Sequence, residues 1–433
     1  MKLFIAGVGE AGGNVADLLV KPEGWLKRKI PTGVVGGIAF NTAIKDLELL
    51  RFMKNRATFG IAFTAGTGVG AKWNLAREAA EKEWDKIEDQ SRDAGILDAD
   101  VILVCLGMGG GTGCGAGPAI ARGYKGVLRA AERHVARGKE QEKDGKEEER
   151  LGLQVLPVFA LGVLPSHTEP RRFKFNTYCA IANLVGGTNE YPDGLIIVDN
   201  DVLFGLKARI PEEAKKKKRS ITTRDIRTII NPRIAECIKL MLVAGNAPAN
   251  YVVDASDCQS SMWSGFGQTG LCVPGYSRVN LKIAKEVTTI EDLVRSAVEK
   301  TYNPRRMSGL LAECDYTTAL KALILVCGPK NSLVVDELEE ARRWLTKEIG
   351  GGDVRIGCAI VPGNFLEVLV ILTCPDIPKL DTLFNEFELY SYTALGDLNR
   401  EGITSDDIEG WKDKMSEYFE AVNRTREIQR ITR

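Results

Sequence analysis

The chain has 433 residues, 44% of them apolar and 27% charged, which is the composition of a globular protein long enough for two domains. Its 58 basic and 58 acidic side chains cancel to a formal net charge of zero, and this balance argues against a nucleic-acid-binding protein. No apolar run reaches transmembrane length, and the first residues lead into a strand and a glycine motif instead of forming a signal peptide. We therefore expect a cytoplasmic protein without an integral membrane segment.

The ten cysteines and two histidines limit the chemistry that the chain can carry. The cysteines lie mostly inside apolar runs and form no C-x-x-C pair, which predicts buried free thiols in a reducing compartment. With only His134 and His167 available, neither a histidine-based metal site nor a Ser–His hydrolase is expected.

A first glycine-rich loop follows the predicted strand Lys2 to Ala6 and leads into a helix that ends near Val20. The loop, Gly7 to Asn14, contains a G-x-G-x-x-G pattern that alone would fit a dinucleotide-binding protein. That fold also needs an acidic residue at the end of the second strand, but the predicted strand Val34 to Phe40 ends in Asn41-Thr42. A nicotinamide-dependent dehydrogenase is therefore kept only as a third possibility.

A second glycine-rich loop, Ala65 to Gly70, follows Ile61 to Phe63 and can be a plain surface turn or a ligand loop. A charged amphipathic helix is then predicted from Asn74 to Arg92. The next apolar run, Val101 to Leu106, is short and partly β-branched, which predicts a buried strand. Strands that alternate with helices predict a parallel sheet covered on both faces, with ligands at the carboxyl ends of the strands.

The most informative stretch is Gly107 to Gly115, between that strand and a helix predicted from Ala116 to Ala131. Several glycines at such a point let the backbone approach a ligand with free amides, which form a phosphate site together with the positive end of the helix. A tight turn is the alternative, although one glycine would suffice for it. The loop is not of the Walker type, because no Gly-Lys-Ser/Thr follows.

The order Gly-Gly-Gly-Thr-Gly-Cys-Gly at residues 109–115 resembles the signature of the tubulin/FtsZ superfamily of GTPases. The resemblance implies an α/β fold whose N-terminal, Rossmann-like GTPase domain has a parallel sheet. The implied parts are the GTP-binding domain (1–221), a long central core helix (222–246), a smaller α+β domain with the hydrolysis loop at its start (247–380) and a C-terminal helical extension (381–433).

The same resemblance implies that GTP or GDP binds with Mg²⁺, which shields the phosphate charge. The nucleotide loops are then formed by Gly9, Glu10, Ala11, Gly12 and Asn14, by Asn41, by Ala65, Gly66, Thr67 and Gly68, and by Gly107, Met108, Gly109, Gly110, Gly111, Thr112 and Gly113. For Asn41, an ordinary helix cap is the alternative.

A third group of implied contacts follows the predicted strand Leu153 to Leu161. Glu169 matches the residue that hydrogen-bonds the ribose hydroxyls in the family, and Asn176 lies seven residues further on. Arg171 and Arg172 do not fall where the bacterial cell-division proteins place an arginine. His167 beside Glu169 suggests an acid–base pair or, more simply, an exposed histidine.

Guanine recognition is implied for two asparagines. Asn200 lies in the predicted buried strand segment Leu195 to Asp201 and has a helix N-cap as its alternative role. Asn231 lies just inside a helix predicted after Thr222 or Thr223, whose apolar spacing resembles the core helix of tubulin. Because Pro232 lacks a backbone donor, we expect the helix either to start at Asn231 or to be kinked there. A carboxamide can satisfy both the donors and the acceptor on the edge of guanine.

Two carboxylates stand three residues apart directly after this helix. Asp254 and Asp257 share one face if the backbone turns helically, and they resemble the hydrolysis loop whose acidic residues reach the nucleotide of the neighbouring subunit. They are therefore the implied catalytic residues, although Val252 stands where the family has Asn. The alternative is a capping Asp254 with an unrelated Asp257.

The remaining chain predicts a different kind of domain. Within the superfamily, its segments Val253 to Asp257, Gly275-Tyr276 and Glu340 to Leu345 most resemble the archaeal CetZ group. Gly265 to Gly270 and Pro274 to Tyr276 are expected to form a glycine-rich entrance. Strands are predicted at Ala319–Cys327, Val354–Val361 and Phe365–Leu372, and a helix at Asp336–Ile349. Ser405 to Arg433 predicts an amphipathic terminal helix that packs on the body or binds a partner protein. The charged run 139–150 is expected to be solvated, and no chemistry is assigned to it. The basic run 211–220 is expected to be a solvated linker or, as the alternative, a site for an acidic partner.

Two functions remain after the dehydrogenase. The first is a cytoskeletal GTPase that assembles head-to-tail into filaments and hydrolyses GTP at the subunit interface. The second is a GTP-binding structural or scaffold protein with little hydrolysis, which Val252, Pro232 and the charged insertions favour.

Overall fold

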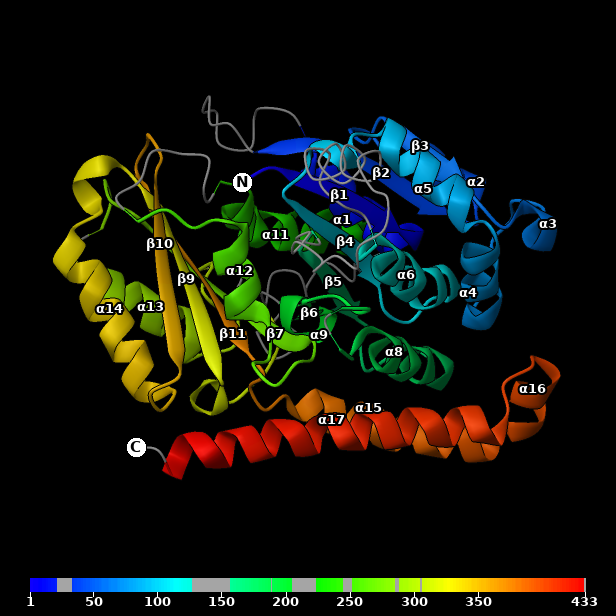
Figure 1. The fold of residues 1–433 in the computed structure, drawn as a ribbon. Helices are drawn as coiled ribbons and strands as arrows, with labels where there is room; N and C mark the ends of the chain where they lie inside the picture. The colour runs from blue at the N-terminus through cyan, green and yellow to red at the C-terminus, as the bar shows by residue number, and fades with distance from the viewer. Residues whose placement is uncertain are drawn as a thin grey trace, which may run out of the picture.

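The computed structural model describes residues 1–21, 33–126, 156–187, 189–204, 223–243, 251–284, 288–303 and 306–431. The expectations for the charged runs 139–150 and 211–220 lie outside these residues. Within them, one large sheet runs through the molecule with helices on both faces (Figure 1). None of the described helices combines the length and the apolar character that crossing a membrane requires.

The sheet contains eleven strands. These are β1 (Leu3–Val8), β2 (Val34–Asn41), β3 (Asn55–Thr58), β4 (Val101–Gly107), β5 (Val158–Leu164), β6 (Gly194–Asp199), β7 (Gly270–Asn280), β8 (Gly309–Leu310), β9 (Lys321–Gly328), β10 (Asp353–Ile360) and β11 (Phe365–Thr373). Their order across the sheet is β10-β9-β11-β7-β6-β5-β4-β1-β2-β3, and β8 pairs with β7. All neighbours from β3 to β7 are parallel, whereas β11 is antiparallel to β7 and β9. The prediction of a parallel N-terminal sheet followed by a mixed C-terminal part is confirmed.

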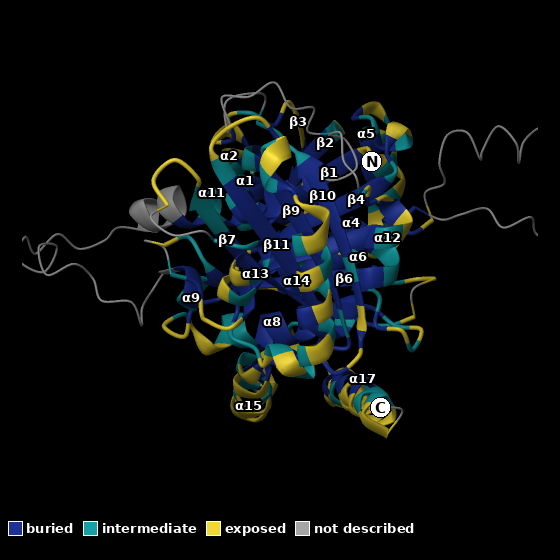
Figure 2. Ribbon diagram, turned by 90° about the vertical axis from the view of Figure 1, so that its left-hand side faces the viewer, coloured by how far each residue is buried: buried dark blue, intermediate teal, exposed yellow. Residues whose placement is uncertain are grey.

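The helices divide between the two faces of the sheet. They are α1 (Gly9–Leu19), α2 (Ile44–Glu48), α3 (Ile61–Thr64), α4 (Trp73–Lys82), α5 (Trp84–Asp93), α6 (Gly111–Tyr124), α8 (Arg171–Leu184), α9 (Asn200–Phe204), α11 (Thr223–Val243), α12 (Ala255–Met262), α13 (Ile290–Val298), α14 (Val335–Glu348), α15 (Pro378–Thr393), α16 (Leu395–Arg400) and α17 (Ser405–Ile431). One buried cluster joins α1, α11 and α12 to the sheet, and a second joins α4, α6, α8, α13, α14, α15 and α17 to its other face. In Figure 2 the strands are buried, while α15 and α17 turn exposed sides outward.

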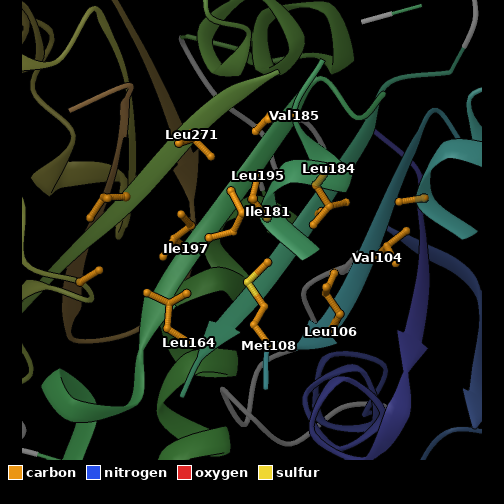
Figure 3. Packing of buried hydrophobic residues seen from close by; sticks show 14 of the residues in the cluster. Val104, Leu106, Met108, Leu164, Ile181, Leu184, Val185, Leu195, Ile197 and Leu271 are labelled. Carbon is orange, nitrogen blue, oxygen red and sulfur yellow. The ribbon is translucent and has the colours of Figure 1, made fainter. Parts of the chain in front are cut away.

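The sheet core is packed with aliphatic side chains that alternate along the strands, because successive residues of a strand point to opposite faces. Figure 3 shows side chains of β4 to β7 meeting those of α8: Val104, Leu106, Leu164, Leu195, Ile197, Leu271, Ile181 and Leu184. Met108 lies in the same cluster with 2% of its surface exposed. Its side chain is therefore a core residue, so any contact it makes with a nucleotide must come from its backbone.

Helix α11 runs unbroken from Thr223 to Val243 with Pro232 inside it, so the alternative start at Asn231 is wrong. Its buried residues Ile234, Ile238 and Met241 belong to a cluster that contains strands from both ends of the sheet. The predicted central position is confirmed. The division into two domains stays a prediction, because the pairing of β6 with β7 makes the sheet continuous between them.

Two other predicted segments differ from the structure. The charged helix predicted from Asn74 to Arg92 is two helices, α4 and α5, which meet at Glu83, whose carboxylate accepts a hydrogen bond from the Gly60 amide (2.8 Å). The expected entrance loop around Gly275 lies inside β7. A Cβ at Gly275 would approach the Ala297 carbonyl oxygen to 2.3 Å, so glycine is needed here for the close contact of α13 with the strand.

The terminal helix α17 packs on the body, as one of its two predicted roles requires. Its hydroxyl-bearing Tyr418 is 1% exposed, donates to the Thr269 carbonyl (2.9 Å) and accepts from the Leu271 amide (3.2 Å). Phe419, the next residue of this amphipathic helix, is 36% exposed.

Replacing Tyr418 with Phe should lower the free energy of unfolding by about 1–3 kcal/mol, because the buried Leu271 amide loses its acceptor. Urea unfolding followed by circular dichroism measures the change. Tyr392→Phe is the matched control, since this tyrosine is 87% exposed and its loss should change the stability by less than about 0.5 kcal/mol. Equal effects of the two substitutions would contradict the assignment.

Candidate functional site

The predicted nucleotide loops all lie at one edge of the sheet. Strands β1 to β6 are parallel, and each of the loops follows the carboxyl end of one of them. Ligands of open α/β sheets bind at this edge. The structure therefore brings together six predicted segments, which begin at residues 9, 41, 65, 107, 165 and 200.

The loop after β1 and the glycine run after β4 pack backbone against backbone. Gly9 has φ +72°, and a Cβ there would lie 2.9 Å from the Gly113 amide nitrogen. A Cβ at Gly113 would lie 2.2 Å from the Gly107 carbonyl oxygen, and one at Gly12 would lie 2.2 Å from that of Cys105. Since these neighbours are backbone atoms that cannot rotate away, glycine is required at these positions. Glu10, Ala11 and Asn14 occupy the first turns of α1 beside them.

Helix α6 begins at Gly111 instead of at the predicted Ala116, so the second half of the glycine run is helical. Three amides of the run already have acceptors inside the protein. Met108 N donates to Val163 O (2.8 Å), Gly109 N to Cys114 Sγ (2.9 Å) and Gly111 N to Gly70 O (3.1 Å).

The amides of Gly110, Thr112 and Gly113 lie at the N-terminus of α6. Thr112 and Gly113 occupy the first turn of α6, where amides have no partner in the helical ladder. Gly110, the N-cap, has ordinary backbone angles (φ −72°, ψ 174°), and nothing lies within 4 Å of where its Cβ would be. Neither backbone strain nor protein packing therefore requires glycine here, and the space it leaves is open at the helix N-terminus.

Hydrogen bonds join the loops after β2 and β3 to each other and to α6. Thr42 Oγ1 and Thr112 Oγ1 lie 2.7 Å apart, and Gly68 N donates to Thr42 O (3.1 Å). Ile44 N donates to Gly66 O (3.0 Å). The loop 65–70 contains left-handed residues, among them Ala65 at φ +50°, which hold it in a tight, non-helical path next to the glycine run.

Asn41 is 2% exposed, and its side chain shapes its own turn. Its Oδ1 accepts from the Ala43 amide (3.1 Å), and its Nδ2 donates to Asp46 (3.0 Å). This local role is close to the helix-capping alternative, and nucleotide contact by Asn41 stays a prediction.

Asn176 is fully buried and links two loops. Its Nδ2 donates to Ala71 O (2.9 Å) and Gly109 O (3.0 Å), and its Oδ1 accepts from Arg172 Nε (3.1 Å). Both of its N–H groups are used, so the geometry favours a positioning role over the predicted direct contact. This role of Arg172 was not predicted, because no local pattern connects it with Asn176 and Ala71.

In the loop after β5, the Glu169 carboxylate accepts a hydrogen bond from the Ser166 amide (2.7 Å). Burial raises the pKa of Glu169. The suggested pairing of His167 with Glu169 is not found. His167 Nδ1 instead lies 2.9 Å from Asp201, and the imidazole is 65% exposed.

Lys379 of α15 joins this loop to the end of β6. Its Nζ donates to Pro165 O (2.8 Å) and pairs with Asp199 and Asp201, the two neighbours of Asn200. Burial raises the pKa of Asp199 in spite of the lysine. Lys379 was missed because it lies 178 residues from Asp201, and no local pattern connects them.

Asp201 should make the stability of this loop depend on pH. Burial raises its pKa, but hydrogen bonds from Ser166, Lys379 and His167 outweigh burial and hold it at about 2, below the ordinary 3.8. The stability that the Asp201 carboxylate contributes is therefore fully present above the pKa it has in the unfolded chain. It is lost as the pH falls through its pKa in the folded protein. We expect Asp201→Asn to destabilise the protein at neutral pH, with a difference from wild type that shrinks as the pH falls from 3.8 toward about 2. Urea midpoints measured across this range check it, and a constant difference would contradict it.

The two guanine-contact candidates come from helices that touch. Asn200 is the first residue of α9, and Asn231 lies inside α11. Helices α9 and α11 are in contact, and Arg233 Nη1 donates to Leu203 O (2.9 Å) across them. The structure thus brings the two helices together, while base recognition itself stays a prediction.

The two candidate acids form a capping box at the start of α12. Asp254 Oδ1 accepts from the Asp257 amide (2.9 Å), and Asp257 Oδ2 accepts from the Asp254 amide (3.1 Å). The Asp257 amide, first among several contacts, lowers the pKa of Asp254. Asp257 also pairs with Arg355 of β10. Asp254 thus caps α12, as the alternative proposed, but Asp257 is its partner in the box and is not unrelated to it. Asp254 and Ser256 are exposed, so the charged carboxylate of Asp254 is accessible.

The acids lie at the edge of the sheet opposite to the nucleotide loops. Cys258, one turn further along α12, has its Sγ 4.0 Å from Met1 Sδ, just before the amino end of β1. The loops at the other end of β1 are therefore about 20 Å away, the length of a six-residue strand. An open pocket of about 340 Å³ next to Asp257 is lined in part by Arg342 and Arg355.

Comparison with known proteins matches both halves of the chain. Residues 2–130 match the GTPase domain of the tubulin/FtsZ family, and residues 225–386 match the C-terminal domain of tubulin-like CetZ proteins. The tubulin-like protein CetZ3 of Haloferax volcanii is 28% identical over 411 residues, which cover 88% of this chain and 90% of the relative. The GTPγS-bound protofilament structure of CetZ2 from that organism has a TM-score of 0.68 at 25% identity, covering 91% of this chain and 99% of its own. The GDP-bound monomer structure of CetZ1 from Haloferax volcanii has a TM-score of 0.68 at 24% identity. The match covers 90% of this chain and 100% of the CetZ1 chain.

Proposed function

We propose that this chain, which belongs to the tubulin/FtsZ superfamily of cytoskeletal GTPases and resembles its CetZ group, assembles head-to-tail into filaments and hydrolyses GTP at the interface between subunits. Its location in the cytoplasm is part of the same proposal. The CetZ2 relative is known as a GTPγS-bound protofilament and CetZ1 as a GDP-bound monomer, which supports GTP and GDP as the ligands here.

The observation that carries this proposal is the placement of the two half-sites. The nucleotide loops lie at the carboxyl edge of the parallel strands, and Asp254 and Asp257 lie at the amino edge, about 20 Å away. No side chain spans that distance, so the acids of one subunit cannot reach its own nucleotide. Stacking identical subunits edge to edge brings the acids of one onto the nucleotide of the next, and such heterologous contacts propagate into filaments.

The residues at the carboxyl edge would divide the recognition of GTP among them. The amides of Gly110, Thr112 and Gly113, with the positive end of α6, suit phosphate oxygens. Glu169 would accept from the ribose hydroxyls, and the carboxamides of Asn200 and Asn231 would bind guanine.

A cation also fits this site. The described residues hold no cluster of three or more carboxylate, imidazole or thiol side chains that would bind a metal alone. A Mg²⁺ ion would therefore be held mainly by phosphate oxygens and water, as is usual for this ion. When bound, it neutralises negative charge on the phosphates.

The acids of the neighbouring subunit would complete the reaction. Asp254, held as a charged carboxylate, and Asp257 would accept hydrogen bonds from water and orient it toward the γ-phosphorus. Phosphoryl transfer needs such positioning more than it needs a covalent nucleophile.

Assembly dependence gives the direct test. Because each active site needs two subunits, the rate of phosphate release should rise more steeply than linearly with protein concentration. Phosphate release measured over a hundredfold concentration range, with sedimentation of the same samples, checks this. A rate strictly proportional to concentration, with no pelleted protein, would contradict the proposal.

A GTP-binding scaffold with little hydrolysis is the second candidate. Val252 is 63% exposed at the acid loop, at the position where the family resemblance implies asparagine, and both acids are engaged in the capping box. This candidate predicts pelleting with GTP as well as with GDP and phosphate release at the level of a blank. Pro232 no longer favours it, because α11 continues through the proline.

A further inference from the structure

The helices α15, α16 and α17 form what we call the C-terminal extension (residues 378–431), in which α15 and α17 pack against α8 (Figure 1). Phe387 stacks on Phe175 of α8 with ring centroids 5.1 Å apart, and Trp411 packs edge-on against Trp73 of α4 at 5.3 Å. Both α8 and α4 begin at the nucleotide edge of the sheet. The extension is therefore seated on the elements that carry the predicted phosphate loops.

One residue of the extension contacts both of the helices that follow these loops. Glu401, in the turn between α16 and α17, pairs through its carboxylate with Arg172 of α8 (2.5 Å), and its carbonyl accepts from Asn74 Nδ2 of α4. The side chains of Glu401 and Arg172 are only 17% and 13% exposed. In such surroundings an ion pair is weakly screened, and removing one partner leaves a charge without its counter-ion.

Arg172 connects Glu401 with the phosphate loops through further hydrogen bonds. Its Nε lies 3.3 Å from Ala71 O and 3.1 Å from Asn176 Oδ1. Asn176 in turn holds Ala71 O and Gly109 O. One continuous set of hydrogen bonds thus runs from Glu401 to the end of the loop 65–70 and to the glycine run.

We propose that Glu401 is a positioning residue for the nucleotide site, which couples the seating of the C-terminal extension to the preference for GTP over GDP. The proposal rests on the proposed function, and it assigns the loop 65–70, one of the implied nucleotide loops beside the glycine run, to the γ-phosphate. Glu401 neutralises Arg172 and fixes the direction of its guanidinium. Arg172 then holds Asn176 and Ala71 where the loop can close on the third phosphate. By reciprocity, a ligand that needs this loop closed also stabilises the seated extension.

The test compares GTP and GDP affinities of full-length variants. Glu401→Gln should weaken GTP binding about tenfold while GDP binding changes less than twofold, so that the ratio of the two affinities falls. Arg172→Lys should do the same, because an ammonium cannot hold several acceptors in the planar arrangement of a guanidinium.

The matched control is Glu386→Gln. Glu386 also joins the extension to α8, through Arg171 (3.3 Å) and Lys174 (3.6 Å). A purely structural role of the extension predicts equal changes for Glu386→Gln and Glu401→Gln, whereas positioning predicts that only Glu401→Gln lowers the GTP/GDP ratio. An unchanged ratio in Glu401→Gln and Arg172→Lys would overturn the inference.

Hydrogen exchange of the unmodified protein gives a second measurement. Amides of the α16–α17 turn, including Gly402 and Ile403, should exchange more slowly with GTPγS bound than with GDP bound. Equal protection would also count against the coupling. If the wild-type protein bound neither nucleotide, the proposed function would fail instead, so the two failures can be distinguished.

Discussion

Two variants that are inactive alone should regain GTP hydrolysis when mixed. The first, Asp257→Asn, keeps its nucleotide loops but lacks the acid; its hydrolysis rate should fall by at least about 100-fold, the usual size of a general acid–base contribution. The second, Gly110→Asp, keeps the acids but places a carboxylate in the proposed phosphate site. Phosphate release from the mixture should exceed the sum of the separate rates at least tenfold, because the acids of the second variant reach the nucleotide of the first.

The expected recovery follows from the opposite placement of the two half-sites, about 20 Å apart along β1. Asp257→Asn preserves an acceptor for the capping box, so α12 should be weakened by no more than about 1 kcal/mol. Asp353→Asn is the matched control: this carboxylate shares Arg355 with Asp257 but lies on β10, and its loss should leave hydrolysis unchanged. Absence of recovery with both variants folded and pelleting would exclude catalysis in trans.

Gly110→Asp should lower GTP affinity by at least about 100-fold without loss of fold stability. The position has open space and N-cap backbone angles, which aspartate adopts readily. Its negative charge at the helix N-terminus stabilises α6 but repels phosphates that would use the same helix end. Titration with a fluorescent GTP analogue, beside urea unfolding, separates the two effects.

Gly110→Ala and Gly410→Ala complete this series. Gly410 also has open space around its Cβ position, but it lies in α17. Gly410→Ala, inside a helix, should keep or raise the stability by up to about 1 kcal/mol. Gly110→Ala, at an N-cap, should lower it by no more than about 1 kcal/mol, and only Gly110→Ala should weaken GTP binding. If GTP binds equally well to both alanine variants and to Gly110→Asp, the phosphates do not lie at the N-terminus of α6.

The strands and the glycine loops could be predicted because their signals are local. Runs such as Val101 to Leu106 are apolar over the length of one strand, and the spacing of glycines around Gly110 marks a backbone that other atoms approach closely. The convergence of the loops also followed, since parallel strands end at one edge.

The contacts that position the loops could not be predicted in the same way. Glu401 lies 229 residues from Arg172, and Lys379 lies 178 residues from Asp201; neither pair leaves a periodic or spaced pattern. The break at Glu83 depends on a hydrogen bond to a loop, and Gly275 inside β7 depends on the approach of α13. Each of these features is decided by a partner distant in the sequence.

The direction of the strands has a mechanical consequence. Strands β1, β4 and β5 run from the edge that carries Asp254 and Asp257 to the edge that carries the glycine loops. Tension transmitted from one subunit to the next would pull along these strands, whereas the hydrogen bonds between them lie across the direction of pull. Many bonds would then be loaded in shear at the same time, instead of opening one after another, so each subunit should act as a stiff link under load.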